Sequence, residues 1–233
     1  MTLAKFLPLL LALVYAWAMY RFSVWRTGRL LDAKSHPLNL PEINRLTRRM
    51  ADALGLPELR VHVFDVDPVN GLAAPDGRIF LTRGFVQKYR TGEVTAEEMA
   101  SVIAHELGHV ALGHTRRRMI DFTGANALFV MLTALLSRFI PFIGVLIANA
   151  ISSALVARLS RRDEHEADAY ASALLVKAGI GTGPQKSLFR KLDHMTGNHG
   201  ANVPEWLRSH PQTTERVARI EEREARWAMG REA

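Results

Sequence analysis

The sequence contains no cysteine among its 233 residues. This absence excludes a disulfide framework, a thiol nucleophile, an iron–sulfur cluster and a zinc site built from thiolates. Any metal would therefore have to be bound by histidine and carboxylate side chains. The lack of disulfides does not assign a redox compartment, because it is compatible with either side of a membrane.

Internal repeats and low-complexity tracts are also absent, and glycine and proline are modest at 16 and 10 residues. Together with a hydrophobic content of 48%, this composition excludes a disordered or collagen-like chain. The length predicts one domain with a sizeable core, or one domain with membrane segments, rather than two full domains.

Negative charge is in short supply, since 30 Lys and Arg face 23 Asp and Glu, for a net charge of +7. Such an excess can indicate binding to nucleic acid. The densest arginine clusters, residues 116–118 and 158–162, instead flank the most apolar part of the chain. We interpret them as charges beside a lipid bilayer, with a solvated surface as the alternative, and we expect no nucleic-acid partner.

A first apolar stretch, residues 6–20, is free of charge and is followed by Trp25 and several arginines. It predicts an N-terminal transmembrane anchor over residues 1–35, with a cleaved signal peptide as the alternative. The basic residues between 21 and 34 outweigh Lys5 and the amino terminus. The rest of the chain is therefore expected on the cytoplasmic side, in a bacterial-type inner membrane.

A second apolar region, residues 123–157, consists of two uncharged stretches separated by Arg138. The first stretch would span about 22 Å as a helix, which is less than the roughly 30 Å of a bilayer core. A spanning hairpin and a buried or interfacial helical hairpin both remain possible. Either arrangement returns the chain to its starting side.

The remaining patterns predict a mainly helical α+β domain over residues 36–233, into which the apolar hairpin is inserted. Thr95 and Glu98 form a capping box at the start of a long helix. Helices are expected over residues 41–54, 95–119, 163–178, 184–194 and 213–228, and strands over 60–66 and 78–82.

The most informative motif is His105-Glu106-Leu107-Gly108-His109, inside the predicted helix of residues 95–119. Residues four apart lie on one helix face, so both imidazoles can bind one ion while Glu106 lies beside them. The alternative is that both are ordinary core or surface histidines. Gly108 would allow another segment to approach the helix.

A catalytic zinc usually has three protein ligands, so a third must come from elsewhere. His114 is one position too close to His109 for the spacing of a third histidine ligand, and we interpret it as a surface residue or a partner of a ligand. Glu164 and Asp168 are four apart, so one could bind the metal while the other orients a ligand histidine. His165 is a weaker alternative ligand, and a charged helix start without function is also possible.

These motifs together resemble the HtpX and CaaX prenyl protease (type I) family of membrane zinc metallopeptidases. The resemblance rests on H-E-x-x-H, an apolar pair, S-R-x-x-E-x-E-A-D from residue 160, a later His210-Pro211 and Arg216. It implies a gluzincin-like domain with one zinc on His105, His109 and Glu164. It further implies the roles of Glu106 as general base, Asp168 as partner of His105, His210 as a catalytic contact near the metal, and Asn70 as a substrate-binding residue on a strand edge.

The sequence thus predicts a membrane-anchored zinc metalloendopeptidase that hydrolyses peptide bonds. The family resemblance adds an expected role in quality control of misfolded membrane proteins, with polypeptides and the lipid bilayer as partners. The alternative is a proteolytically silent, zinc-containing membrane chaperone or adaptor. An intact Glu106 favours the enzyme.

Overall fold

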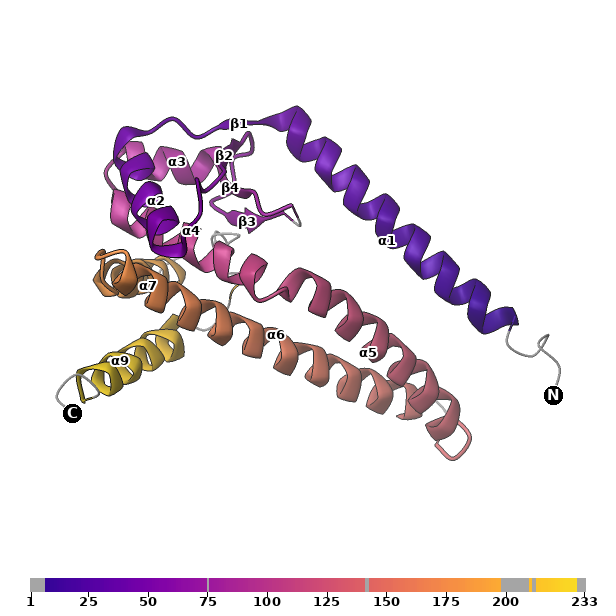
Figure 1. Cartoon of the computed structure of the whole chain (residues 1–233). Helices are drawn as coiled ribbons and strands as arrows, with labels where there is room; N and C mark the ends of the chain where they lie inside the picture. Colours follow the sequence, from indigo (N-terminus) through magenta and orange to yellow (C-terminus); the bar gives the residue numbers. More distant parts are fainter. Residues whose placement is uncertain (1–6, 75, 141–142, 198–209, 211–212, 230–233) are drawn as a thin grey trace.

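The computed structural model describes residues 7–74, 76–140, 143–197, 210 and 213–229. These residues form long helices and one small mixed sheet, which lies beside α2, α3 and α4 (Figure 1). The predicted mainly helical α+β class is therefore confirmed. The division into an anchor of residues 1–35 and a domain of residues 36–233 stays a prediction.

The sheet has four strands in the order β1-β2-β4-β3. Their bounds are Ser35–Pro37 for β1, Val61–Phe64 for β2, Gly71–Ala73 for β3 and Ile79–Thr82 for β4. Strand β4 pairs parallel with β2 and antiparallel with β3. All residues of β4 are buried, whereas β3 lies at an edge of the sheet.

The two predicted strands are present in shortened form as β2 and β4. The strands β1 and β3 were not predicted, because a three-residue strand contains too little alternation to recognise. Helix α3, Arg83–Arg90, was also missed. Its start follows directly on β4, where the Thr82 side chain accepts a hydrogen bond from the backbone N–H of Phe85.

Helix α2, Pro41–Leu54, has the predicted bounds. Proline at its first turn costs no hydrogen bond, and Gly55 ends it in the left-handed conformation with φ 69°. The apolar stripe of α2 includes Ile43 and Met50, which are both fully buried. Helix α2 thereby covers one side of α4.

Helix α4, Ala96–Ala111, runs through the centre of the domain and begins with the predicted capping box. Its residues Met99 and Ile103 are completely buried. The predicted helix of residues 95–119 is wrong at its end, because Gly113 adopts φ 67° and interrupts it. A new helix, α5, starts at His114, five residues after the last histidine of the motif.

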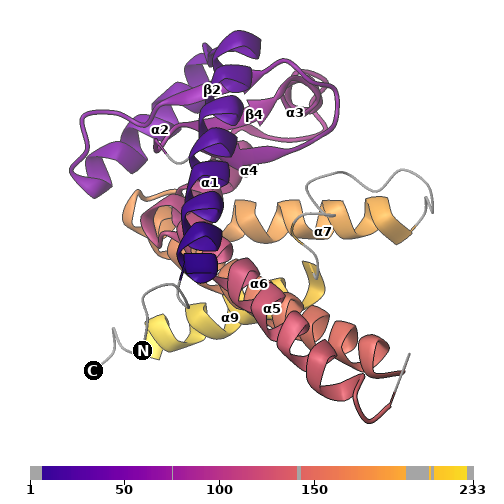
Figure 2. The same cartoon turned by 90° about the vertical axis from the view of Figure 1, so that its right-hand side faces the viewer.

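Helices α5, His114–Leu136, and α6, Ile143–Lys177, lie side by side and project from the rest of the molecule (Figures 1 and 2). Helix α6 joins the second apolar stretch to the predicted helix of residues 163–178, since no glycine or proline separates them. Among the described residues, α6 is long and apolar enough to cross a membrane.

The described part of the chain contains three further helices: α1, Leu7–Lys34, α7, Gly183–Gly197, and α9, Thr213–Met229. Helices α7 and α9 contact one another, and they pack against α4 and α6 respectively. Helix α1 extends away from the domain (Figure 1). Its role as a membrane anchor stays a prediction.

Candidate metal centre

Helix α4 places His105 and His109 one turn apart and points both rings to one side. Both side chains are buried, and their Nε2 atoms are 3.1 Å apart. A backbone segment of another helix reaches this face because position 108 is glycine. A Cβ atom at Gly108 would lie 3.0 Å from the carbonyl oxygen of Ala167 in α6, so a larger residue would push α6 away from the two histidines.

Helix α6 brings Glu164 to the same point, one turn before Ala167. One carboxylate oxygen of Glu164 lies 3.3 Å from Nε2 of His105, and the other lies 3.5 Å from Nε2 of His109. The Glu164 side chain is buried. The two histidines and the glutamate therefore converge, although Glu164 lies at least 55 positions after either histidine along the chain.

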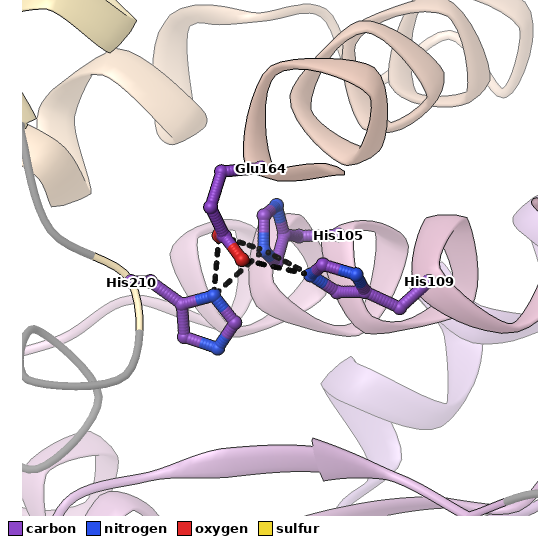
Figure 3. Close-up of side chains that lie close together, drawn as sticks. All are labelled: His105, His109, Glu164 and His210. Atoms are coloured by element: carbon purple, nitrogen blue, oxygen red, sulfur yellow. Dashed lines mark hydrogen bonds and ion pairs between the residues drawn. The ribbon is translucent and has the colours of Figure 1, made fainter. Parts of the chain in front are cut away.

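His210 joins this group from a segment far along the sequence (Figure 3). Its Nδ1 atom contacts Glu164 and lies 3.4 Å from Nε2 of His105. Its Nε2 atom lies 3.6 Å from Oε1 of Glu106. The four side chains of His105, His109, Glu164 and His210 could hold a metal ion, because their ligand atoms all lie within 4.8 Å of one another.

The spacing of these atoms fits a zinc ion. Tetrahedral zinc with bonds of about 2.0–2.1 Å keeps its ligand atoms about 3.3–3.4 Å apart. The distances between His105, His109 and Glu164 range from 3.1 to 3.5 Å. In addition, Oε1 of Glu106 is buried without a hydrogen-bond partner among the described residues, as expected for a group that awaits a ligand or water.

Two of the three side chains, His109 and Glu164, are in the form that binds a cation. Burial, together with the charge of His105, lowers the pKa of His109 to about 2. Burial would raise the pKa of Glu164, but its contacts with His105 and His210 hold that pKa well below its usual range. Burial opposes charge on His105 as well, yet hydrogen bonds to Asp168 and Glu164 raise its pKa to about 9. A cation that binds through His105 would therefore compete with a proton on that ring.

Asp168 lies one turn beyond Glu164 and orients His105. Its Oδ1 atom is 2.9 Å from Nδ1 of His105. Arg216 of α9 donates two hydrogen bonds to the same carboxylate, at 2.6 and 2.7 Å, and a third to the backbone carbonyl of His210 at 3.2 Å. Arg216 thus connects the partner of one histidine with the backbone of another.

A cavity of about 220 Å³ opens beside these side chains. The edge strand β3 lines it together with Asn70, Glu106, His109 and His210. The Asn70 side chain accepts a hydrogen bond from the backbone N–H of Gly71 at 3.0 Å, and Asn70 is also bonded to Thr82. These bonds hold the start of β3 along the wall of the cavity.

Comparison with known protein families agrees with this site, because residues 37–224 match peptidase family M48. The chain belongs to peptidase family M48. The family resemblance drawn from the sequence is thereby confirmed, and with it the assignment to metallopeptidases.

Several M48-type relatives are named metallopeptidases. Metalloprotease LoiP of Escherichia coli K12 is 29% identical over 199 residues, which cover 83% of this chain and 75% of LoiP. Mitochondrial metalloendopeptidase OMA1 of Schizosaccharomyces pombe is 28% identical over 189 residues, or 80% of this chain and 53% of OMA1. Human OMA1 is 25% identical over 202 residues, which cover 82% of this chain and 36% of human OMA1. The chain thus spans about half the length of the yeast relative, 53%.

Two arginines of the M48 domain were interpreted as membrane-flanking charges, with a solvated surface as the alternative, and the structure gives them a further role. Arg118 donates a hydrogen bond of 2.8 Å to Glu164, and Arg117 donates bonds of 3.1 and 2.6 Å to Asp163 and Glu166. These pairs could have been predicted from the apolar hairpin. Residues 117 and 118 lie about as far before its turn as the acidic residues lie after it, so the two groups face each other when the hairpin closes.

Two histidines near the site differ from their sequence interpretation. His165 points away, with its Nε2 atom 3.5 Å from Glu215, so the weaker alternative for the third ligand is wrong. His114 is completely buried, so the surface alternative is wrong as well. The break at Gly113 turns His114 back toward His109, whereas a continuous helix would have carried it to the opposite face.

Proposed function

We propose that this M48 protein is a zinc-dependent metalloendopeptidase with one zinc bound by His105, His109 and Glu164. The observation that carries the proposal is the convergence of these three donors, at tetrahedral spacing, beside a buried carboxylate oxygen of Glu106 that has no hydrogen-bond partner in the described part of the chain. Nucleophilic side chains of the Ser or Cys type play no part in this arrangement.

A bound zinc would supply Lewis-acid polarisation of the scissile carbonyl and of the attacking water. Glu106 accepts the proton of that water at its carboxylate and then delivers it to the leaving amine. Asp168 keeps the proton of His105 on Nδ1, so that Nε2 presents its lone pair toward the site. The buried surroundings strengthen both interactions by excluding water.

His210 is proposed as a second polar contact for the reacting carbonyl. Its ring lies between Glu106 and Glu164, and its backbone carbonyl is held by Arg216. A donor in this position can stabilise negative charge that develops on the carbonyl oxygen.

The proposed substrate is an extended polypeptide that pairs with the edge strand β3. Edge strands present unpaired backbone groups, and pairing recognises the backbone more than a defined side-chain sequence. Gly71, Leu72 and Ala73 of β3 line the same cavity as Glu106. Asn70 is proposed to contact the substrate at the end of this strand.

We further propose that the protein acts at a membrane, on misfolded membrane proteins. Exposed apolar side chains on the α5–α6 hairpin support contact with lipid, and they include Val130, Phe139 and Leu146 at 65, 72 and 69% exposure. A surface of this kind marks a membrane or protein interaction. The quality-control role rests on the family resemblance.

We also propose that the catalytic domain faces the cytoplasm, and reporter fusions test this orientation. We expect reporters fused after Lys34 and at the carboxyl end to report a cytoplasmic location, because basic residues follow the first apolar stretch. A fusion after Arg138 distinguishes a spanning hairpin, with a reporter on the far side, from an interfacial one. An exported reporter at the carboxyl end would contradict the proposed orientation.

Zinc content and chelator sensitivity test the proposed activity. We expect one zinc per chain in the purified protein and cleavage of casein that stops on chelation and resumes on zinc addition. Zinc without cleavage of casein or of a membrane-protein substrate would favour the silent chaperone or adaptor. Absence of stoichiometric zinc would exclude the enzyme.

A further inference from the structure

His114, the first residue of α5, lies beside the second histidine of the motif and lines the same cavity. Its Nδ1 atom lies 2.8 Å from Nδ1 of His109, and its Nε2 atom lies 3.2 Å from Oε2 of Glu166. The residue is completely buried. Both nitrogens of the ring are therefore used, one toward the metal centre and one toward α6.

The rules of hydrogen bonding determine which ring nitrogens of His109 and His114 carry a proton. A His109 ring that binds a metal through Nε2 carries its proton on Nδ1 and must donate it. His114 can accept that proton only if its own Nδ1 is unprotonated, so its proton resides on Nε2. From there it donates to the carboxylate of Glu166. The arrangement selects one tautomer of each histidine.

Glu166 is the fixed acceptor at the end of this series of hydrogen bonds. Arg117 donates to Oε2 of Glu166 at 2.6 Å, and Arg162 donates to Oε1 at 2.8 Å. Two guanidinium partners keep the carboxylate ionised and fixed, which makes it a strong acceptor. His105 is oriented by Asp168 directly, whereas His109 reaches its carboxylate through an intervening imidazole.

A second cation site is the other possible use of these groups, since His114, Asp163 and Glu166 could together hold an ion. The carboxylates, however, already accept hydrogen bonds from Arg117, and Asp163 also accepts one from Arg118 at 3.3 Å. The position is thus occupied by positive side chains, and the Nδ1 atom of His114 is turned toward His109. The contacts favour support of His109 over a separate metal site.

We propose that His114 is a positioning residue that fixes the tautomer and the ring orientation of His109 through a relay to Glu166. The proposal rests on the proposed function, because it assumes a metal on Nε2 of His109. It makes the base of the α5–α6 hairpin part of the metal centre, since α5 supplies His114 and α6 supplies Glu166 and Glu164.

Substitutions in the full chain test the relay. His114→Leu removes both hydrogen bonds, whereas His114→Gln retains one acceptor and one donor. His165→Leu is the matched control, because His165 is a neighbouring histidine of α6 that contacts Glu215 instead of the centre. The readouts are zinc affinity, measured by competition with a chromophoric chelator, and the visible spectrum of the cobalt-substituted protein, which reports ligand geometry.

We expect zinc affinity to fall about 10–100-fold in His114→Leu, with an altered cobalt spectrum, as for loss of other partners of metal-binding histidines. His114→Gln should recover most of the affinity, and the control should stay within about twofold of the parent protein. Glu166→Gln, at a partly exposed position, provides a second variant with a smaller loss in the same direction.

The outcomes separate the two proposals. Unchanged zinc affinity and cobalt spectrum in His114→Leu would overturn the relay. If His114→Leu fails to fold, an unchanged zinc affinity in Glu166→Gln overturns it instead. A parent protein that binds no stoichiometric zinc would overturn the proposed function itself, before any variant is compared.

Discussion

Glu106→Gln is expected to retain one zinc per chain and to lose peptidase activity by about 10²–10⁴-fold. Glutamine has nearly the same shape as glutamate, and Oε1 of Glu106 has no hydrogen-bond partner in the described structure that the amide would break. The amide cannot accept a proton from water, so the loss falls on the chemical step. The measurement is kcat/KM on a quenched peptide, alongside zinc content.

Two further variants serve as controls for Glu106→Gln. His105→Ala should lose both zinc and activity, because it removes a donor to the metal. Glu97→Gln, at an exposed position near the start of the same helix, should change neither zinc content nor activity. Full activity in Glu106→Gln would show that another group is the base.

Arg216→Met is expected to lower the free energy of unfolding by about 3–5 kcal/mol, the usual cost of leaving one buried charge without its partner. Arg216 is completely buried and donates two hydrogen bonds to the buried Asp168. Its guanidinium also lies 4.2 Å from the centre of the Phe189 ring. Methionine would fill part of the volume while leaving the buried charge of Asp168 with only its contact to His105. Denaturant unfolding in the presence of chelator measures the change without a contribution from zinc.

Arg219→Met on the same helix is the matched control. Arg219 pairs with Glu215 one turn away, and both side chains are about half exposed, at 48 and 47%. Exposed pairs of this kind contribute about 0–1 kcal/mol. Adding Asp168→Asn to Arg216→Met should recover part of the lost stability, because it removes the buried charge that has lost its arginine partner. A loss below about 1 kcal/mol in Arg216→Met would contradict this account of the buried pair.

Interactions within one helix could be predicted from the sequence. The capping box at Thr95, the bounds of α2 between Pro41 and Gly55, and the shared face of His105 and His109 depend on residues at most a few positions apart or on intrinsic backbone preferences. Such signals do not require knowledge of the fold. The break at Gly113 was also local, since glycine favours the left-handed conformation, but its signal was overlooked inside a longer helical pattern.

Motif resemblance extended the prediction beyond one helix. It named Glu164, Asp168 and His210 together with the histidine motif, and the structure brings all of them to one point. Spacing alone had left either Glu164 or Asp168 as the metal ligand and His165 as a weaker alternative. A charged helix start without function also remained possible, because acidic residues four apart occur in such helices. Only the packing of α6 against Gly108 separates Glu164 from His165.

Absent cysteine and the histidine motif by themselves determined that a metal in this protein would bind to imidazole and carboxylate groups, and that α4 would supply two of them. Tertiary structure alone decided that His114 supports His109, that Arg117 and Arg118 pair with acids of α6, and that β3 lines the cavity. The physical reason is the distance along the sequence between the residues that interact. Helix periodicity acts over four residues, whereas these contacts depend on how separate helices and three-residue strands pack together.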